Sequence, residues 1–168
     1  MLFRSLGAHG RGGATVAAVA AEAGIAPGLL HHYFTGKQEL YEMLLDELRA
    51  EFRRRLDAHS AADPLDAYIG AALALDGRSD ATAARAWVGI FAEALSDPVM
   101  FTKVRRVMDA EVERVVRRSS GALSADGASA VVAFVVGALV FGAFAPRKAA
   151  GFAAPSLRRM LPGLRARG

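Results

Sequence analysis

Residues 15–34, TVAAVAAEAGIAPGLLHHYF, restrict the possible fold more than any other stretch of the chain. Thr15 can accept a hydrogen bond from a backbone N–H and so cap a helix. Gly24 stands where a left-handed residue commonly ends a helix, and Pro27 suits the first turn of a new one. Between Thr15 and Gly24, apolar residues repeat at the spacing of one helix face: Val16, Val19, Ala20 and Ala23. The stretch therefore predicts two short helices joined by a tight turn.

The second of these helices has an inner and an outer face. Leu30 and Phe34 are four residues apart, so they share the inner face. The remaining residues lie on the outer face: Gly28, Leu29, His31, His32 and Tyr33. An exposed second helix of this kind can enter the major groove of DNA. We therefore predict a helix-turn-helix that binds double-stranded DNA through this face and Pro27, with the Thr15 hydroxyl able to donate to a phosphate.

The two adjacent histidines, His31 and His32, are not expected to bind a metal. Neighbouring residues on a helix point about 100° apart, so they cannot easily share one ion. The sequence also lacks cysteine and any HExxH-like partner. Contact of one of the two side chains with DNA bases or phosphates is the favoured interpretation.

A long helix is predicted after Phe34. Thr35 and Gln38 have the spacing of a capping box at its start. Lys37 falls in the first turn, where free N–H groups and the helix dipole favour a phosphate. Apolar residues then recur at every fourth position: Leu40, Leu44, Leu48, Phe52 and Leu56. We expect this helix to cover residues 36–58 and to connect an N-terminal head to the rest of the chain.

The stretch GATVAAVAAEAGIAPGLLHHYFTGKQELYEMLL resembles the DNA-binding region of the TetR family of bacterial transcriptional regulators. The matching positions are Thr15, the turn of Ala20, Ala23, Gly24 and Ile25, then Pro27, Gly28, Leu30, Tyr33, Phe34, Lys37 and Leu40. His31 and Leu29 depart from the tyrosine and hydroxyl residues usual there. The resemblance implies that Tyr33 and Lys37 contact phosphates. It also implies a body whose pocket takes a ligand that weakens DNA binding, and a four-helix dimer interface built from the last two long helices.

Composition and charge set the limits around this motif. Residues 1–59 carry seven basic and seven acidic side chains, whereas residues 147–168 carry six basic and no acidic ones. The pI of about 10.0 therefore comes from the tail rather than from the head. Strand signals are scarce, so we predict an all-α fold. Its expected parts are a three-helix head at residues 1–38 and an effector-binding and dimerisation body at residues 59–168.

The expected body helices supply candidates for an effector pocket. They cover residues 64–77, 82–95, 98–120 and 128–145, with a short final helix at 155–164, and residues 77–82 are expected to form a loop. Aromatic and methionine side chains typically line apolar cavities. Here they are Tyr68, Trp87, Phe91, Met100, Phe101, Val104 and Met108. Ordinary core packing is the alternative for each, and the expected effector is largely apolar.

The uncharged run of residues 128–145 has two interpretations. It approaches the roughly 17–25 residues of a membrane span, and a membrane-associated protein using this run and the basic tail is the alternative function. Its alanine and glycine content also suits a closely packed helix pair. Five residues spaced by three and four would form the seam: Val131, Phe134, Ala138, Phe141 and Ala145. We favour a dimer seam in a cytoplasmic protein without membrane contact.

The sequence gives little support for an enzyme. Its four histidines, at positions 9, 31, 32 and 59, form no catalytic constellation with a nucleophile or paired carboxylates. We expect no cofactor and no metal. The predicted function is that of a homodimeric transcriptional regulator, a repressor that leaves a palindromic operator when a small-molecule effector binds.

Overall fold

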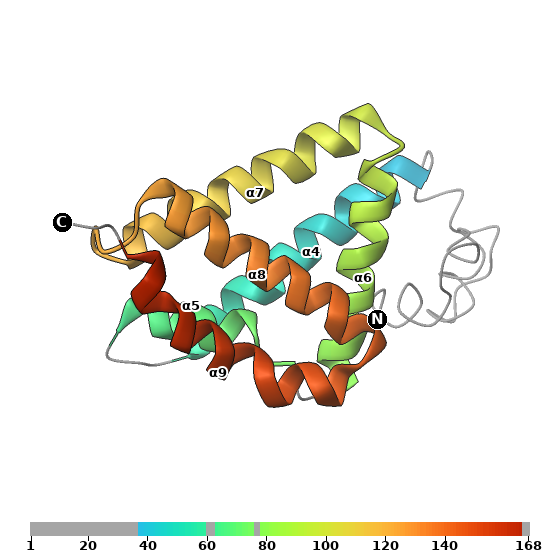
Figure 1. Cartoon of the computed structure of the whole chain (residues 1–168). Helices are drawn as coiled ribbons and strands as arrows, with labels where there is room; N and C mark the ends of the chain where they lie inside the picture. Colours follow the sequence, from blue (N-terminus) through green and yellow to red (C-terminus); the bar gives the residue numbers. More distant parts are fainter. Residues whose placement is uncertain (1–36, 60–62, 76–77, 166–168) are drawn as a thin grey trace.

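The computed structural model describes residues 37–59, 63–75 and 78–165 (Figure 1). Six helices make up this part: α4 (Lys37–Ala58), α5 (Pro64–Ala72), α6 (Arg78–Ala94), α7 (Pro98–Arg118), α8 (Ala125–Phe144) and α9 (Pro146–Leu164). The described residues contain no strand, only an isolated bridge between Leu123 and Arg165. The all-α prediction is confirmed. Residues 1–36 of the predicted head (residues 1–38) lie outside the described residues.

Helix α4 follows the expected pattern of one buried face. Leu44, Leu48 and Leu56 are buried, and Phe52 makes an edge-on contact with Tyr68 of α5 at a centroid distance of 5.7 Å. The repeat at every fourth position therefore marks the side of α4 that packs on α5, α6 and α7. The helix begins at Lys37 and ends at Ala58, close to the predicted bounds.

Two boundaries in the next segment differ from the prediction. Asp63 caps α5 by accepting from the backbone N–H of Leu65 at 2.8 Å, but α5 ends at Ala72 rather than near residue 77. The helix stops there because Leu73 leaves the helical conformation, and both Leu73 and Leu75 are buried in the core. Helix α6 starts at residue 78, inside the expected loop. Apolar periodicity alone did not show where the chain turns.

Helices α7 and α8 have clear capping residues. Asp97 accepts from the N–H groups of Val99 at 2.8 Å and Met100 at 3.0 Å, as expected of an N-cap. The chain turns after α7 through Ser120 and Gly121, whose φ angles are 51° and 83°. Ser124 then caps α8, because its hydroxyl accepts from Gly127 N–H at 3.1 Å.

The last helix is longer than predicted. Helix α9 begins at Pro146 rather than at residue 155, and it includes both Pro155 and Pro162. A proline inside a helix usually costs about 3 kcal/mol. Both prolines are exposed, while the opposite face buries three residues spaced by four: Ala149, Ala153 and Leu157. Burial of this face against α8 and α5 offsets the lost backbone hydrogen bonds.

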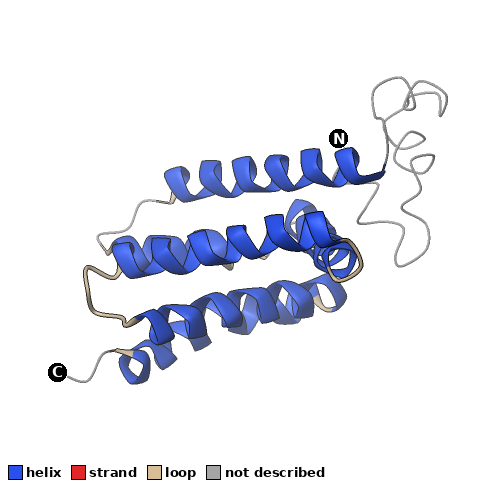
Figure 2. Cartoon of the chain, turned by 90° about the horizontal axis from the view of Figure 1, so that it is seen from above, coloured by secondary structure: helices blue, strands red, loops and turns tan. Residues whose placement is uncertain are grey.

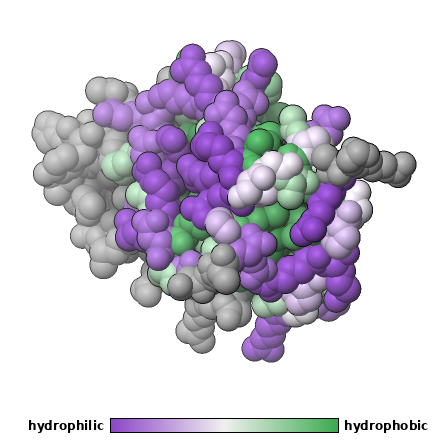
Figure 3. Space-filling view, turned by 90° about the vertical axis from the view of Figure 1, so that its left-hand side faces the viewer, coloured by the Kyte–Doolittle hydropathy of each residue, from purple (hydrophilic) through white to green (hydrophobic). Residues whose placement is uncertain are grey.

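The helices lie in layers when the fold is viewed from above (Figure 2). Helix α4 forms one side, whereas α8 and α9 pack together on the other. One core cluster lies between α5, α7, α8 and α9, and a second joins the N-terminal half of α4 to α6 and α7. Apolar surface is visible between hydrophilic side chains on one face of the molecule (Figure 3).

Candidate functional site

Most of the predicted DNA contacts lie outside the described residues. This applies to Thr15, Pro27, Gly28, Leu29, His31, His32 and Tyr33. Lys37 is the first residue of α4, and only its backbone is described. Helix α4 therefore starts immediately after the predicted head, and any signal between the head and the body along the chain passes through this helix.

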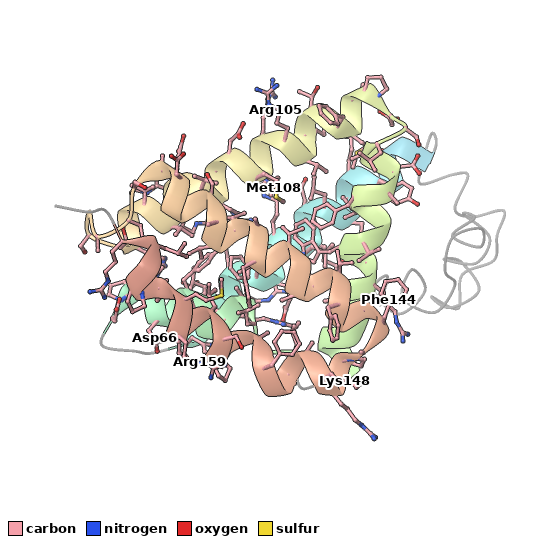
Figure 4. All side chains as sticks on the ribbon, in the orientation of Figure 1. Asp66, Arg105, Met108, Phe144, Lys148 and Arg159 are labelled. Atoms are coloured by element: carbon pink, nitrogen blue, oxygen red, sulfur yellow. The ribbon has the colours of Figure 1, made fainter. Side chains whose placement is uncertain are left out.

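A cavity of about 100 Å³ lies within the helical body. Side chains from α4, α5, α6, α7 and α8 form its wall. Four of the seven predicted pocket residues are in this wall: Tyr68, Trp87, Phe91 and Met108. Met108 extends from α7 toward the interior of the fold (Figure 4). The cavity thus lies between α4 on one side and Val132, Val135 and Leu139 of α8 on the other.

The other three predicted pocket residues lie elsewhere, and the sequence analysis is corrected on this point. Met100 is fully buried in the core between α4, α6 and α7, where Val104 packs against the same cluster. Phe101 is half exposed. The cavity meets α7 from Val107 onward, because the first turns of α7 pack directly on α4 and α6.

Two aromatic pairs shape the cavity wall. Trp87 and Phe91 of α6 stack at a centroid distance of 5.6 Å with an interplanar angle of 29°. Phe52 and Tyr68 meet edge to face. Such ring contacts favour particular ring orientations, and they stabilise the fold beyond what the burial of apolar area contributes. The wall therefore offers fixed aromatic faces to an apolar ligand.

Glu111 adds a carboxylate to the same wall, and the sequence analysis did not predict it. Its Oε1 accepts from Nη1 of Arg114 at 2.9 Å, and its side chain is only 18% exposed. Oε2 is buried without a hydrogen-bond partner. Desolvation raises the pKa of Glu111, partly opposed by the Arg114 charge and the Tyr68 hydroxyl beside it. Burial likewise raises the pKa of Tyr68.

The spacing of α7 contained the signal for Glu111. It follows Met108 by three residues and Val107 by four, which places it on the same face as these two cavity residues. A carboxylate on an otherwise apolar face is informative because buried acids are uncommon unless paired. The sequence analysis did not include Glu111 among the candidate pocket residues.

The N-terminal half of α4 is held by both polar and apolar contacts. Nζ of Lys103 on α7 lies 2.6 Å from Oε2 of Glu42 on α4. Next to this ion pair, Tyr41, Leu44 and Leu45 pack into the cluster that contains Ile90 and Met100. This cluster shares Leu48 and Val107 with the cavity wall, so packed side chains extend from the cavity to Tyr41 of α4.

The predicted dimer seam is largely directed inward. Val131 and Ala138 are 0% and 4% exposed within one protomer, and Phe134 packs against the same core. The seam prediction is wrong for Val131 and Ala138, because both are buried in the core cluster of their own chain. Ala145 is half-buried, and only Phe141 is exposed.

A different face of α8 and α9 is apolar and exposed. Its large residues are Val140, Phe141, Phe144, Phe152 and Met160. Phe144 is 81% exposed and stands out from the end of α8 (Figure 4). Phe141 of α8 contacts Phe152 of α9 edge to face at 5.3 Å. The two helices thus present one continuous apolar surface.

Helix α8 is long and apolar enough to cross a membrane, and it is the one such helix in the part of the chain that the structure describes. In this fold, however, eight of its residues are buried against other helices of the same chain. A core helix passes the same length and composition test, so the apolar run does not favour a membrane protein. Across residues 37–59, 63–75 and 78–165, no three potential ligands gather at a metal site.

Comparison with known proteins identifies the head. The sequence model for bacterial regulatory proteins of the TetR family matches residues 3–44, which include the predicted helix-turn-helix and the start of α4. The predicted resemblance to the TetR family is confirmed for this DNA-binding region. The chain is a DNA-binding transcriptional regulator, as predicted. The proposed membrane alternative receives no support.

Individual relatives agree with this assignment to the TetR family. The HTH-type transcriptional regulator BetI of Agrobacterium fabrum is 27% identical over 142 residues, which cover 77% of this chain and 68% of the relative. BetI of Brucella canis is 43% identical over 56 residues. A crystal structure of a transcriptional regulator from Rhodococcus sp. Rha1 covers 97% of this chain with a TM-score of 0.84 at 20% identity. This last likeness shows the same fold.

Proposed function

We propose that this TetR-family regulator is a repressor that leaves its operator when a small molecule enters the body cavity. The observation that carries the proposal is the position of α4. Leu48 and Phe52 of this helix form part of the cavity wall, and its first residues belong to the segment that matches the family's DNA-binding region. One rigid helix therefore connects the ligand site with the DNA-binding head.

A ligand changes DNA affinity only if it binds two shapes of the body with different affinity. The cavity offers such a difference because α4 and α8 form opposite walls. A ligand that fills the space favours a position of α4 set by its own bulk. That position is transmitted along the packed cluster around Tyr41, Leu44 and Met100 and alters the placement of the head.

We further propose a homodimer through the exposed apolar surface of α8 and α9. One recognition helix reads few base pairs, whereas a two-fold pair reads both halves of a palindromic operator. Linking the heads raises the effective concentration of the second head once the first is bound. A change in the spacing of the two heads then lowers affinity for the operator as a whole.

In this proposal residues 1–38 form the head, residues 36–58 the connecting helix and residues 59–168 the effector-binding and dimerisation body. The predicted DNA contacts divide by role. Tyr33 and Lys37 bind phosphates, and His31 reads bases. The protein acts in the cytoplasm by binding alone, without catalysis or a cofactor.

The decisive experiment begins with selection of bound fragments from random DNA, using the purified full chain. Gel-shift titrations with the selected operator then measure affinity with and without candidate effectors, and Trp87 fluorescence reports ligand binding at the cavity. A palindromic selected site and weaker operator binding in the presence of a bound ligand would support the proposal. A ligand that changes Trp87 fluorescence but leaves operator affinity unchanged would refute coupling through this cavity.

A further inference from the structure

The carboxylate of Glu111 distinguishes the cavity from a purely apolar one. Its Oε1 is occupied by Arg114 at 2.9 Å, whereas Oε2 is buried with no hydrogen-bond partner among the described residues. Nearly all buried polar atoms in folded proteins have a partner, because removing them from water costs free energy that only a hydrogen bond recovers. Glu111 is a residue of the cavity wall, and the neighbouring Tyr68 hydroxyl forms no hydrogen bond with Oε2. This carboxylate therefore keeps an unused acceptor that a ligand donor can satisfy.

The charges around this acceptor select among possible ligand groups. Arg114 pairs with Glu111, and the positive charges of Arg49 and Arg118 also act on it. The cavity lining as a whole contains four arginines, Arg49, Arg53, Arg55 and Arg114, against two carboxylates, Glu51 and Glu111. A ligand cation would be repelled by the arginines, and a ligand carboxylate would face Glu111 itself. A neutral donor meets neither obstacle.

We propose that the cavity binds a compact amphiphile whose neutral hydrogen-bond donor, a hydroxyl or an amide N–H, donates to the Glu111 carboxylate. The apolar part of the ligand lies against the ring pair of Trp87 and Phe91 and against Met108. This assignment rests on the proposed function, which makes the cavity the effector site, and it gives that effector a chemical class. It adds a specific polar contact to the expectation of a largely apolar effector.

The volume of the cavity limits the size of the ligand. Its volume of about 100 Å³ corresponds to roughly seven to ten water molecules, at about 10–15 Å³ of this measure for each. A single aromatic ring with a two-carbon chain and one polar group has a comparable size. Ligands of this kind can place the ring between the aromatic walls while the polar group reaches Glu111.

Four probes that share one phenyl ring test the proposal: 2-phenylethanol, 2-phenylethylamine, 3-phenylpropionate and ethylbenzene. Binding to the full chain is measured at neutral pH by Trp87 fluorescence. We expect the alcohol to bind about tenfold more tightly than ethylbenzene, because a hydrogen bond to a charged group contributes at least this factor. The amine and the carboxylate should both bind more weakly than the alcohol.

Substitution of Glu111 provides the second part of the test. Glu111→Leu should remove the preference for the alcohol while leaving the affinity for ethylbenzene within about twofold. Glu113→Leu is the matched control, since Glu113 lies on the exposed side of the same helix, and it should keep the preference. If the Leu variant does not fold, Glu111→Gln retains the shape and should reduce the preference by removing the charge.

Several results would overturn the assigned ligand class. These are equal affinity for the alcohol and ethylbenzene, tighter binding of the amine or the carboxylate, an unchanged alcohol preference in the Glu111 variants, or no alcohol binding up to its solubility limit. Failure of the proposed function has a different signature. If the alcohol preference holds but operator affinity does not respond, the ligand class stands and the coupling to DNA fails.

Discussion

Lys103 of α7 and Glu42 of α4 form an ion pair with a distance of 2.6 Å between Nζ and Oε2. The pair joins the helix that carries Met108 and Glu111 of the cavity to the first turns of the helix that follows the DNA-binding head. Both side chains are about one-third exposed, so their attraction is partly screened by solvent. This ion pair therefore matters more for the position of α4 than for the stability of the fold.

The first prediction concerns this ion pair. Lys103→Ala should cost less than about 1 kcal/mol of stability, as for other exposed pairs, but should weaken operator binding several-fold by loosening the start of α4. Thermal melting and gel-shift titration measure the two effects. Arg105→Ala is the control, because Arg105 is exposed and its ion pair, with Asp109, lies within α7. Equal operator affinities for both variants would contradict a positioning role for Lys103.

The second prediction separates core from cavity on α7. Met100→Ala removes a fully buried side chain and should destabilise the protein by about 2–5 kcal/mol. Ligand affinity at Trp87 should stay unchanged, because Met100 does not line the cavity. Met108→Ala should weaken ligand binding and should reduce stability less than Met100→Ala does. Urea unfolding and fluorescence titration of both variants decide between these roles.

The third prediction follows from the raised pKa of Glu111. The folded protein holds a proton on this group up to higher pH than the unfolded chain does. The resulting stabilisation is therefore fully present below the ordinary pKa of 4.5 and is lost as pH rises through the raised value. The stability of the parent relative to Glu111→Gln should fall over this window. Urea unfolding of both proteins between about pH 4 and 7.5 tests the sign.

A control is needed for the general effect of removing a negative charge from α7. Glu113→Gln serves this purpose, because Glu113 is exposed and its nearest cation, Arg117, is on the same helix. Its stability relative to the parent should show less change across the same pH range. A difference that grows in favour of the parent as pH rises would contradict the environment described for Glu111.

Local signals made much of this fold predictable. The turn at Gly24 and Pro27 and the capping pair Thr35 and Gln38 led to the family and to the start of α4. The expected start of α7 at residue 98 also agrees with the structure, where Asp97 caps the helix, because caps act within one turn of chain. The length of α9 was not predictable from such signals. By local sequence signals, Pro155 predicts the start of a helix. The chain stays helical on both sides of Pro155 only because Ala149 and Leu157 pack on other helices.

The candidate sites show the same limit. Tyr68 and Trp87, which were proposed because aromatic residues are common in cavity walls, both line one cavity. Met100 has the same character but lies in the core, since the distinction depends on which turn of α7 meets α4. On α8, apolar residues occur around the whole helix, so its sequence could not show that Val131 faces inward and Phe144 outward. Hydrophobic periodicity specifies a face only where a polar face contrasts with it.

The last prediction concerns the exposed surface of α8 and α9. Phe144→Arg places a charge on a side chain that is 81% exposed in the protomer, so the fold itself should be unaffected. If this surface joins two copies, the charge is buried at their interface, and burying an unpaired charge is costly. We expect a folded monomer with strongly reduced affinity for a palindromic operator, because the two heads are no longer linked.

Two further variants make this test specific. Leu95→Arg is the matched control, since Leu95 is 82% exposed but lies beyond the end of α6, and this variant should remain dimeric. Ala138→Arg, by contrast, forces a charge into the protomer core, where Ala138 is 4% exposed, and should destabilise the fold itself. Light scattering and circular dichroism separate loss of dimer from loss of structure. A parent protein that is monomeric yet binds a palindrome tightly, or a Phe144→Arg variant that remains dimeric, would refute this interface.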